Sequence, residues 1–239
     1  MTEPTGGDEG NERATTLADA NDERSSVEGK VPDLPELTED EVARIEARNG
    51  LLQTTAMLDA IEASLEAGRF RLRPSSMMSL QRYSVQGLKS DAGGYRKGTI
   101  GISNSSHEPP PPEDVAAHVD DLCDYVNDNW ESCTPIHLAA YVMWRLNWIH
   151  PFSDGNGRTS RAVSYLVLCV RLGFLLPGQE TIPERIAANK FDYYHALDEA
   201  DARWSEGRLD VSKMEALLEG HLAKQLVSIH ELASGKSVE

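Results

Sequence analysis

The feature that most constrains this chain is a polar loop between two apolar segments. The loop, residues 149–161, reads IHPFSDGNGRTSR. Residues 135–148 before it have the apolar spacing of a buried helix, and residues 162–176 after it are almost entirely apolar. Segments with so few polar residues have to be buried, so the sequence predicts a loop that joins two core helices.

Two glycines give this loop the backbone of an anion site. Gly155, Asn156 and Gly157 can adopt tight, positive-φ conformations that turn successive N–H groups towards one point. A helix that starts there adds the positive end of its dipole. Arg158 and Arg161 lie three residues apart on one helix face, where both guanidinium groups could bind further phosphate oxygens. The pattern indicates a site for a polyphosphate.

The acid and the base of the loop suit the same ligand. Asp154 is placed to hold a hydrated Mg²⁺ beside clustered phosphates, and His150 is placed to take a proton from an attacking hydroxyl group. Singly, each has a simpler explanation, because a lone histidine near a helix end is usually packed or solvated. A lone arginine pair is likewise usually engaged in surface ion pairs. The ordered combination favours the site, with Phe152 pointing inward to anchor the loop.

Residues 150–161 resemble the Fic motif, His-x-Phe-x-Asp/Glu-Gly-Asn-Gly-Arg-x-x-Arg, at every defined position. The resemblance implies an all-α Fic fold with a small β-hairpin flap. It implies transfer of AMP from ATP to a Ser, Thr or Tyr hydroxyl group of a target protein, with release of pyrophosphate. By this resemblance, His150 would be the general base and Asp154 the Mg²⁺ ligand. The anion hole would be formed by Gly155, Asn156 and Gly157. Arg158 and Arg161 would contact the outer phosphates.

Other functions stay open at this point. Family members with altered motifs transfer phosphoryl or phosphocholine groups, although the intact motif favours AMP. The pocket could also use another nucleotide donor or remove AMP from a modified protein. A non-catalytic, nucleotide-sensing binding module is a further alternative, against which the intact His150 and Asp154 count. A homodimer is one possible oligomeric state.

A second resemblance concerns regulation. Residues 24–29, RSSVEG, resemble the Ser/Thr-x-x-x-Glu-Gly/Asn inhibitory motif of many Fic proteins, although Arg24 stands where that motif has Ser or Thr. The resemblance implies that Glu28 pairs with Arg161 and prevents productive binding of the ATP γ-phosphate. A flexible acidic arm is the simpler interpretation. Glu46 is a weaker candidate, because Val42 stands four residues before it.

Charge and cysteine content limit the partners and the compartment. The net charge of −16 argues against nucleic acid or an anionic membrane as the main partner. Residues 1–41 carry thirteen acids and three basic residues, a net charge of −10. Three cysteines without metal-ligand spacing fit reduced thiols. Without a signal peptide or a membrane-spanning stretch, we expect a cytoplasmic protein, although an exported effector would look the same.

The chain divides into three parts. Residues 1–37 form an acidic arm with a short helix over 17–28, residues 38–112 form N-terminal helices and the flap, and residues 113–239 form the Fic core. Helices are expected over 38–67, 75–83, 113–129, 135–148, 162–176, 181–204 and from 210 or 212 onwards. Gly-rich residues 93–103 predict a β-hairpin or an extended flap. By resemblance, this flap holds the target segment by strand addition. Tyr193, Tyr194 and His195 either line an adenosine pocket or pack in the core.

Overall fold

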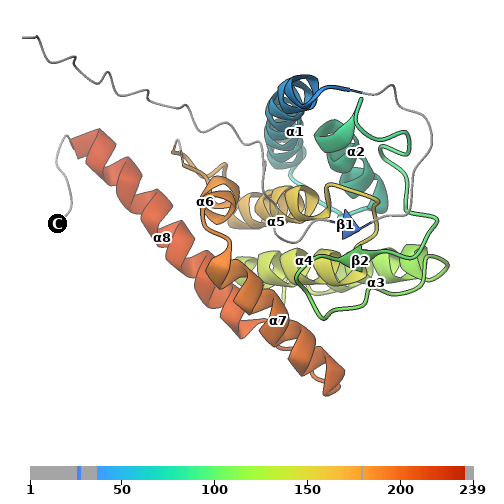
Figure 1. Ribbon diagram of the computed structural model, residues 1–239. Coiled ribbons are helices and arrows are strands. Elements are labelled where there is room, and N and C mark those ends of the chain that lie inside the picture. The colour runs from blue at the N-terminus through green and yellow to red at the C-terminus, as the bar shows by residue number, and fades with distance from the viewer. Residues whose placement is uncertain (1–25, 28–36, 179, 235–239) are drawn as a thin grey trace, which may run out of the picture.

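The protein is described by a computed structural model that places residues 26–27, 37–178 and 180–234 (Figure 1). Within these residues it contains eight helices and two very short strands. The helices are α1 (Glu39–Ala67), α2 (Pro74–Val85), α3 (Val115–Asp128), α4 (Pro135–Ile149), α5 (Asn156–Leu172), α6 (Ile182–Ala188), α7 (Phe191–Ser205) and α8 (Ser212–Ser234). The prediction of an all-α fold is confirmed.

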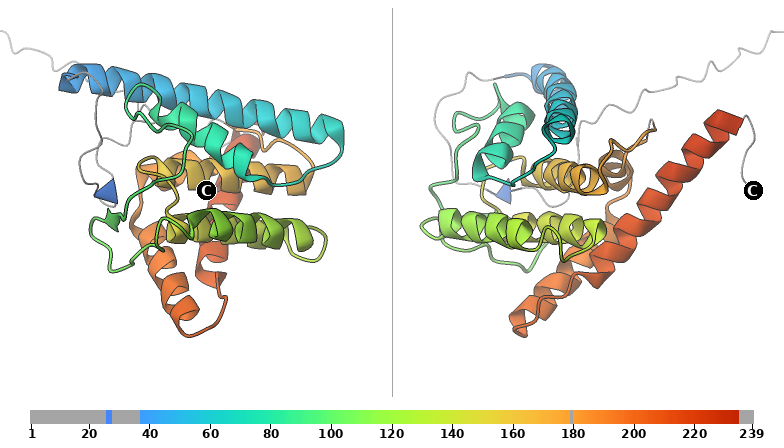
Figure 2. Two further views of the ribbon diagram at one scale, coloured as in Figure 1. Left: turned by 90° about the vertical axis from the view of Figure 1, so that its right-hand side faces the viewer. Right: turned by 180° about the vertical axis from the view of Figure 1, so that it is seen from behind.

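Helices α4 and α5 form the centre of the bundle. They pack against each other, α1 and α2 cover α5, and α3, α7 and α8 pack on α4 (Figure 2). The core between them is apolar, and its residues Trp144, Leu146, Val163 and Val167 are fully buried. Residues from 38–112, such as Met57, belong to the same core cluster. The loop predicted to join two core helices therefore leaves the middle of the bundle.

Local signals explain why the long helices start and end where they do. Thr38 and Glu41 form a capping box, in which the Thr38 Oγ1 accepts from the Glu41 N–H and the Glu41 carboxylate accepts from the Thr38 N–H. Gly68 then ends α1 in the left-handed conformation with φ 62°. The Thr134 side chain caps α4 by accepting from the His137 N–H, and Pro135 occupies the first turn. These boundaries match the prediction.

The predicted flap differs from a hairpin. Strand β2 (Gly101–Ile102) pairs antiparallel with β1 (Ser26–Val27), with Ser26 opposite Ile102 and Val27 opposite Gly101. The prediction of a helix over 17–28 is thus wrong at residues 26–27, while residues 17–25 and 28 lie outside the described residues. The N–H of Arg96 donates to the carbonyl of Pro151, 2.9 Å away, and so connects the start of the flap to the motif loop.

Two further helix predictions need correction. The helix expected over 162–176 begins at Asn156 and ends at Leu172, where Gly173 adopts φ 85° as its cap. The helix expected over 181–204 is two helices, α6 and α7, because Asn189 between them is extended with φ −145°. The Asn189 side chain accepts from the Phe191 N–H and so helps to start α7. Among the described residues, no helix is long and apolar enough to cross a membrane.

Candidate active site

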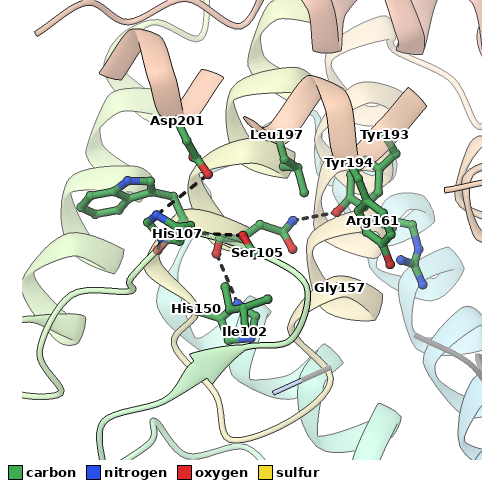
Figure 3. A pocket seen from close by; sticks show the side chains of 12 residues that line it. Ile102, Ser105, His107, His150, Gly157, Arg161, Tyr193, Tyr194, Leu197 and Asp201 are labelled. Atoms are coloured by element: carbon green, nitrogen blue, oxygen red, sulfur yellow. Dashed lines mark hydrogen bonds and ion pairs between the residues drawn. The ribbon is translucent and has the colours of Figure 1, made fainter. Parts of the chain in front are cut away.

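His150 directly follows α4 and is the first residue of the motif. It caps the helix in the left-handed conformation, with φ 49° and ψ 58°, which is uncommon for a residue with a side chain and costs about 1–2 kcal/mol. Pro151 helps to stop the helix, because a residue before proline is disfavoured in the helical conformation. His150 is 4% exposed but lines a pocket that Ile102 of β2 also lines (Figure 3).

The tautomer of His150 follows from one contact. Its Nδ1 is 3.3 Å from the carbonyl oxygen of Asn147, which can only accept a hydrogen bond. The neutral imidazole therefore carries its proton on Nδ1, and the lone pair is on Nε2. This is the form in which Nε2 can accept a proton.

The N-terminus of α5 forms the next wall of the pocket. Gly155 caps the helix with φ 77°, as predicted, whereas Gly157 lies in the first turn and lines the pocket. The first N–H groups of a helix have no partner within it, so they are available to an anion. Asn156 fixes this turn, since its side chain accepts from the Phe152 N–H at 3.0 Å and donates to the Phe152 carbonyl at 2.8 Å. Phe152 is fully buried, which confirms that it anchors the loop.

The two motif arginines do not share one environment. Arg161 is 4% exposed and lines the pocket together with His150 and Gly157. Arg158 instead donates to the carbonyl of Ser84 at 3.1 Å and to Asp154 Oδ1 at 3.3 Å, and it lines a second hollow, which Arg161 also reaches. Arg161 therefore borders both hollows, while Arg158 holds the loop and borders the second one.

The opposite wall of the pocket comes from α7. Tyr193, Tyr194 and Leu197 face the α5 terminus, and Asn147 of α4 donates to the Tyr193 hydroxyl at 2.8 Å (Figure 3). The cavity volume of the pocket is about 30 Å³, far below the roughly 300–1,000 Å³ of a typical small-molecule site. His195, which the sequence placed beside the tyrosines, borders a neighbouring hollow on α6 and α7.

A histidine and an aspartate close the far end of the pocket. His107 Nε2 donates to the carbonyl of Trp148 at 2.7 Å, and its Nδ1 lies 3.9 Å from Asp201. Asp201 also accepts from the indole N–H of Trp144 at 2.8 Å. Neither His107 nor Asp201 was identified from the sequence, because each lies far along the chain from the motif and stands in no recognisable spacing.

Asp154 is the one predicted metal ligand. Its Oδ1 accepts from the Gly155 N–H and from Arg158, and its side chain is 37% exposed. The described residues contain no group of three or more His, Cys, Asp or Glu side chains that could hold a metal ion. Mg²⁺ is commonly held by one or two carboxylates together with substrate phosphates and water, so a single accessible aspartate fits a Mg²⁺ ion that enters with a nucleotide.

Comparison with known proteins locates a family match within the chain. Residues 71–168, which include the whole motif, match the Fic/DOC family. This segment is similar to a Fic domain. Two curated relatives, each a protein adenylyltransferase Fic, are 35% identical over 114 residues in Nematostella vectensis and 29% identical over 167 residues in Drosophila willistoni. The matches cover 46% and 66% of this chain, but only 24% and 31% of those relatives.

Solved structures share the Fic fold. A Fic-domain signalling protein from Bacteroides thetaiotaomicron superposes with a TM-score of 0.64 at 20% identity, covering 87% of this chain and 79% of that one. A fragment of Fic-1 from C. elegans superposes with a TM-score of 0.62 at 22% identity, covering 86% of this chain and 56% of the fragment. At these identities the likeness establishes the fold alone.

The pocket and the turn beneath it thus bring together part of the predicted site. His150, Gly157 and Arg161 share one pocket, while Gly155 and Asn156 shape the turn beneath it. Asp154 and Arg158 form an ion pair with each other. Neither is among the described residues that line the pocket. Glu28 lies outside the described residues.

Proposed function

We propose that the chain is a protein adenylyltransferase, which transfers AMP from ATP to a hydroxyl group of a target protein and releases pyrophosphate. The observation that carries the proposal is that the His150 imidazole, in its Nδ1–H tautomer, lines the same pocket as the N-terminus of α5 and Arg161. The names of the curated relatives support this activity. ATP is then the substrate.

The oxygen of the target hydroxyl attacks the α-phosphorus of ATP, its proton passes to His150 Nε2, and the bond from the α-phosphorus to the bridging oxygen of pyrophosphate breaks. N–H groups at the start of α5 would stabilise the charge on the equatorial oxygens, and Arg161 would orient the leaving group. Arg158 would contact the outer phosphates only after exchanging its present bond to Asp154. Mg²⁺ on Asp154 would supply further neutralisation of the phosphates.

The target side chain would be a Ser, Thr or Tyr of another protein, held along the flap. Main-chain bonds of an added strand do not depend strongly on sequence, so other surfaces would choose the target. All three cysteines are free thiols, and two of them, Cys123 and Cys169, are buried. This chemistry suits a reducing compartment such as the cytoplasm, which we propose as the location.

Regulation by Glu28 is part of the proposal. Its carboxylate would compete with the γ-phosphate for Arg161, which is buried and borders the pocket. Replacement of Glu28 by glycine should then raise AMP transfer by about tenfold or more, because one charge-assisted contact is worth about 1.5–3 kcal/mol. Equal transfer by both proteins would remove Glu28 from this role.

The test uses ATP labelled at the α- or the γ-phosphate, in the native chain and in the Glu28→Gly variant. We expect label from the α-position alone on a protein in a cell lysate, and none with His150→Ala, which should fold normally. Label from the γ-position would indicate phosphoryl transfer, and label from other α-labelled nucleotides would indicate another donor. Release of AMP from a labelled protein would indicate removal of AMP. Tight ATP binding without any covalent product would support a nucleotide-sensing module.

A further inference from the structure

Arg96 is a buried arginine in the flap whose contacts surround the motif histidine. It is 3% exposed, and its partners among the described residues are backbone carbonyl oxygens. Burial lowers the pKa of its guanidinium group, yet an arginine remains charged at neutral pH. A buried cation with no role in the proposed chemistry needs an explanation.

The hydrogen bonds of Arg96 bracket His150 on both sides. Its Nε donates to the carbonyl of His150 at 2.8 Å, and its Nη2 lies 3.4 Å from the carbonyl of Ile149. Its own backbone N–H donates to the carbonyl of Pro151 at 2.9 Å. Three successive carbonyls, at positions 149, 150 and 151, are therefore held by one residue that lies 54 positions away from His150.

These contacts complete the C-terminus of α4. The last carbonyls of a helix have no partner within it, and a positive charge near them is stabilised by the helix dipole. Here each of these carbonyls accepts a hydrogen bond from a side chain. The Asn147 carbonyl accepts from His150 Nδ1, and the Trp148 carbonyl accepts from His107. The carbonyls of positions 149 and 150 accept from Arg96. The left-handed His150 backbone is thus fixed by its surroundings, as a strained residue has to be.

The same guanidinium group reaches the flap. Nη1 donates to the carbonyl of Gly98 at 3.0 Å, three residues before β2, and Nη2 donates to the carbonyl of Pro110 in the proline-rich segment behind the flap. Ile102 of β2 lines the same pocket as His150 (Figure 3). Arg96 therefore connects both ends of the flap to the backbone that carries the imidazole.

We infer that Arg96 is a positioning residue for His150. It fixes the left-handed backbone of the histidine, and with it the Nδ1–H tautomer, relative to the flap that would hold the target hydroxyl. The inference rests on the proposed function for its kinetic consequence, but its structural consequence, the orientation and tautomer of the imidazole, can be measured without any turnover.

The kinetic test compares Arg96→Ala and Arg96→Lys in the Glu28→Gly chain, with Arg44→Ala as the control because Arg44 is an exposed arginine of α1 outside the flap and the pocket. For Arg96→Ala we expect kcat for AMP transfer to fall about 100-fold, since a small misplacement of a catalytic group has such an effect. The KM for ATP should stay within about threefold, because Arg96 does not line the pocket. Added guanidinium ion at millimolar concentration should restore part of kcat in Arg96→Ala, and Arg44→Ala should behave like the parent chain.

The second measurement is the ¹⁵N spectrum of the His150 imidazole, assigned by comparison with His150→Ala. The parent chain should show protonated Nδ1, and folded Arg96→Ala should show a mixture of both tautomers. If Arg96→Ala does not fold, the same spectrum is recorded for Arg96→Lys, since lysine keeps the charge but lacks the planar fork of the guanidinium group. An unchanged imidazole spectrum, or a kcat loss that only follows the unfolded fraction, would overturn the inference. Should the parent chain transfer no AMP, the proposed function fails, and the spectrum alone decides on Arg96.

Discussion

Single residues decide the shape of the motif loop, and Gly155 shows this most clearly. It needs φ 77°, and a Cβ atom built on it would lie 2.5 Å from Ser84 Oγ and 3.0 Å from Val85 Cγ1. The glycine is therefore required twice, for its backbone conformation and for the close approach of α2 to the start of α5. A larger residue would push the first turn of α5 away from its place in the pocket.

We predict that Gly155→Ala lowers the free energy of unfolding by about 2–4 kcal/mol, which combines the positive-φ strain with overpacking against Ser84. Gly207→Ala is the matched control. Gly207 has φ 78°, but a Cβ atom there would meet nothing within 4 Å, so it should lose only about 1–2 kcal/mol. Urea unfolding of both variants measures the difference. Equal losses would mean that α2 does not press on the turn.

The residue scale also separates what the sequence can predict from what it cannot. The capping residues Thr38 and Gly68, and the inward Phe152, were predictable because each acts on its own neighbours along the chain. The pairing of Asp154 with Arg158 is a four-residue spacing on a helix start and was open to the same reasoning. The contact of Arg96 with His150 was not, because no local pattern joins positions 54 residues apart.

At the scale of elements, the close packing of α4 and α5 determines where the loop lies. The Ser164 hydroxyl of α5 donates to the Ala139 carbonyl of α4 at 2.8 Å, and Ala139 and Ala140 are fully buried. Small residues at the crossing let the two backbones approach, so the ends of both helices meet at the pocket. Helix termini that were further apart would separate His150 from the start of α5.

Replacing Ala139 by leucine should therefore reduce stability by about 1–3 kcal/mol through overpacking. It should also reduce AMP transfer, since α4 and α5 would have to move apart. The control is Ala116→Leu on the exposed side of α3, where leucine should be tolerated. Chemical unfolding and α-label transfer measured on both variants would test this. A stable Ala139→Leu protein with full activity would contradict the tight crossing.

Element boundaries were predictable where the signal is local and less so elsewhere. The start of α4 followed from Thr134 and Pro135, and the end of α1 from Gly68. The division between α6 and α7 was missed, although Asn189 offers a helix-starting side chain between them. The partner of β2 could not be predicted, because strand pairing is a non-local contact and β1 lies far earlier in the chain.

At the scale of the whole molecule, two partly buried histidines, His118 and His221, have a lowered pKa. Burial, followed by the nearby Arg145, lowers the pKa of His118 from its usual 6.5, against the opposing effect of Asp121 and Asp114. Burial likewise lowers the pKa of His221, with smaller contributions in the same direction from Lys224 and Arg185. The unfolded chain therefore binds more protons than the native protein once the pH falls below about 6.5, so stability is lost on acidification.

We predict that the free energy of unfolding falls between pH 7 and pH 5, and that His118→Gln makes this fall shallower. His195→Gln is the control, because His195 is exposed. Urea midpoints at several pH values would measure the slopes. If His118→Gln and His195→Gln have the same slope as the native chain, His118 is not protonated in unfolding over this range, and its burial against Trp148 is looser than the structure indicates.

The central claim is that His150 acts in transfer, while the start of α5 and Arg161 bind the phosphates of ATP. Its most direct test is to measure ATP binding by calorimetry and AMP transfer from α-labelled ATP on the same samples of His150→Ala and Arg161→Ala, in the Glu28→Gly chain. We predict that folded His150→Ala binds ATP within about threefold of the parent and transfers no AMP, whereas Arg161→Ala binds ATP about tenfold or more weakly. Transfer by His150→Ala at the parent rate, or parent-like ATP binding by Arg161→Ala, would contradict it.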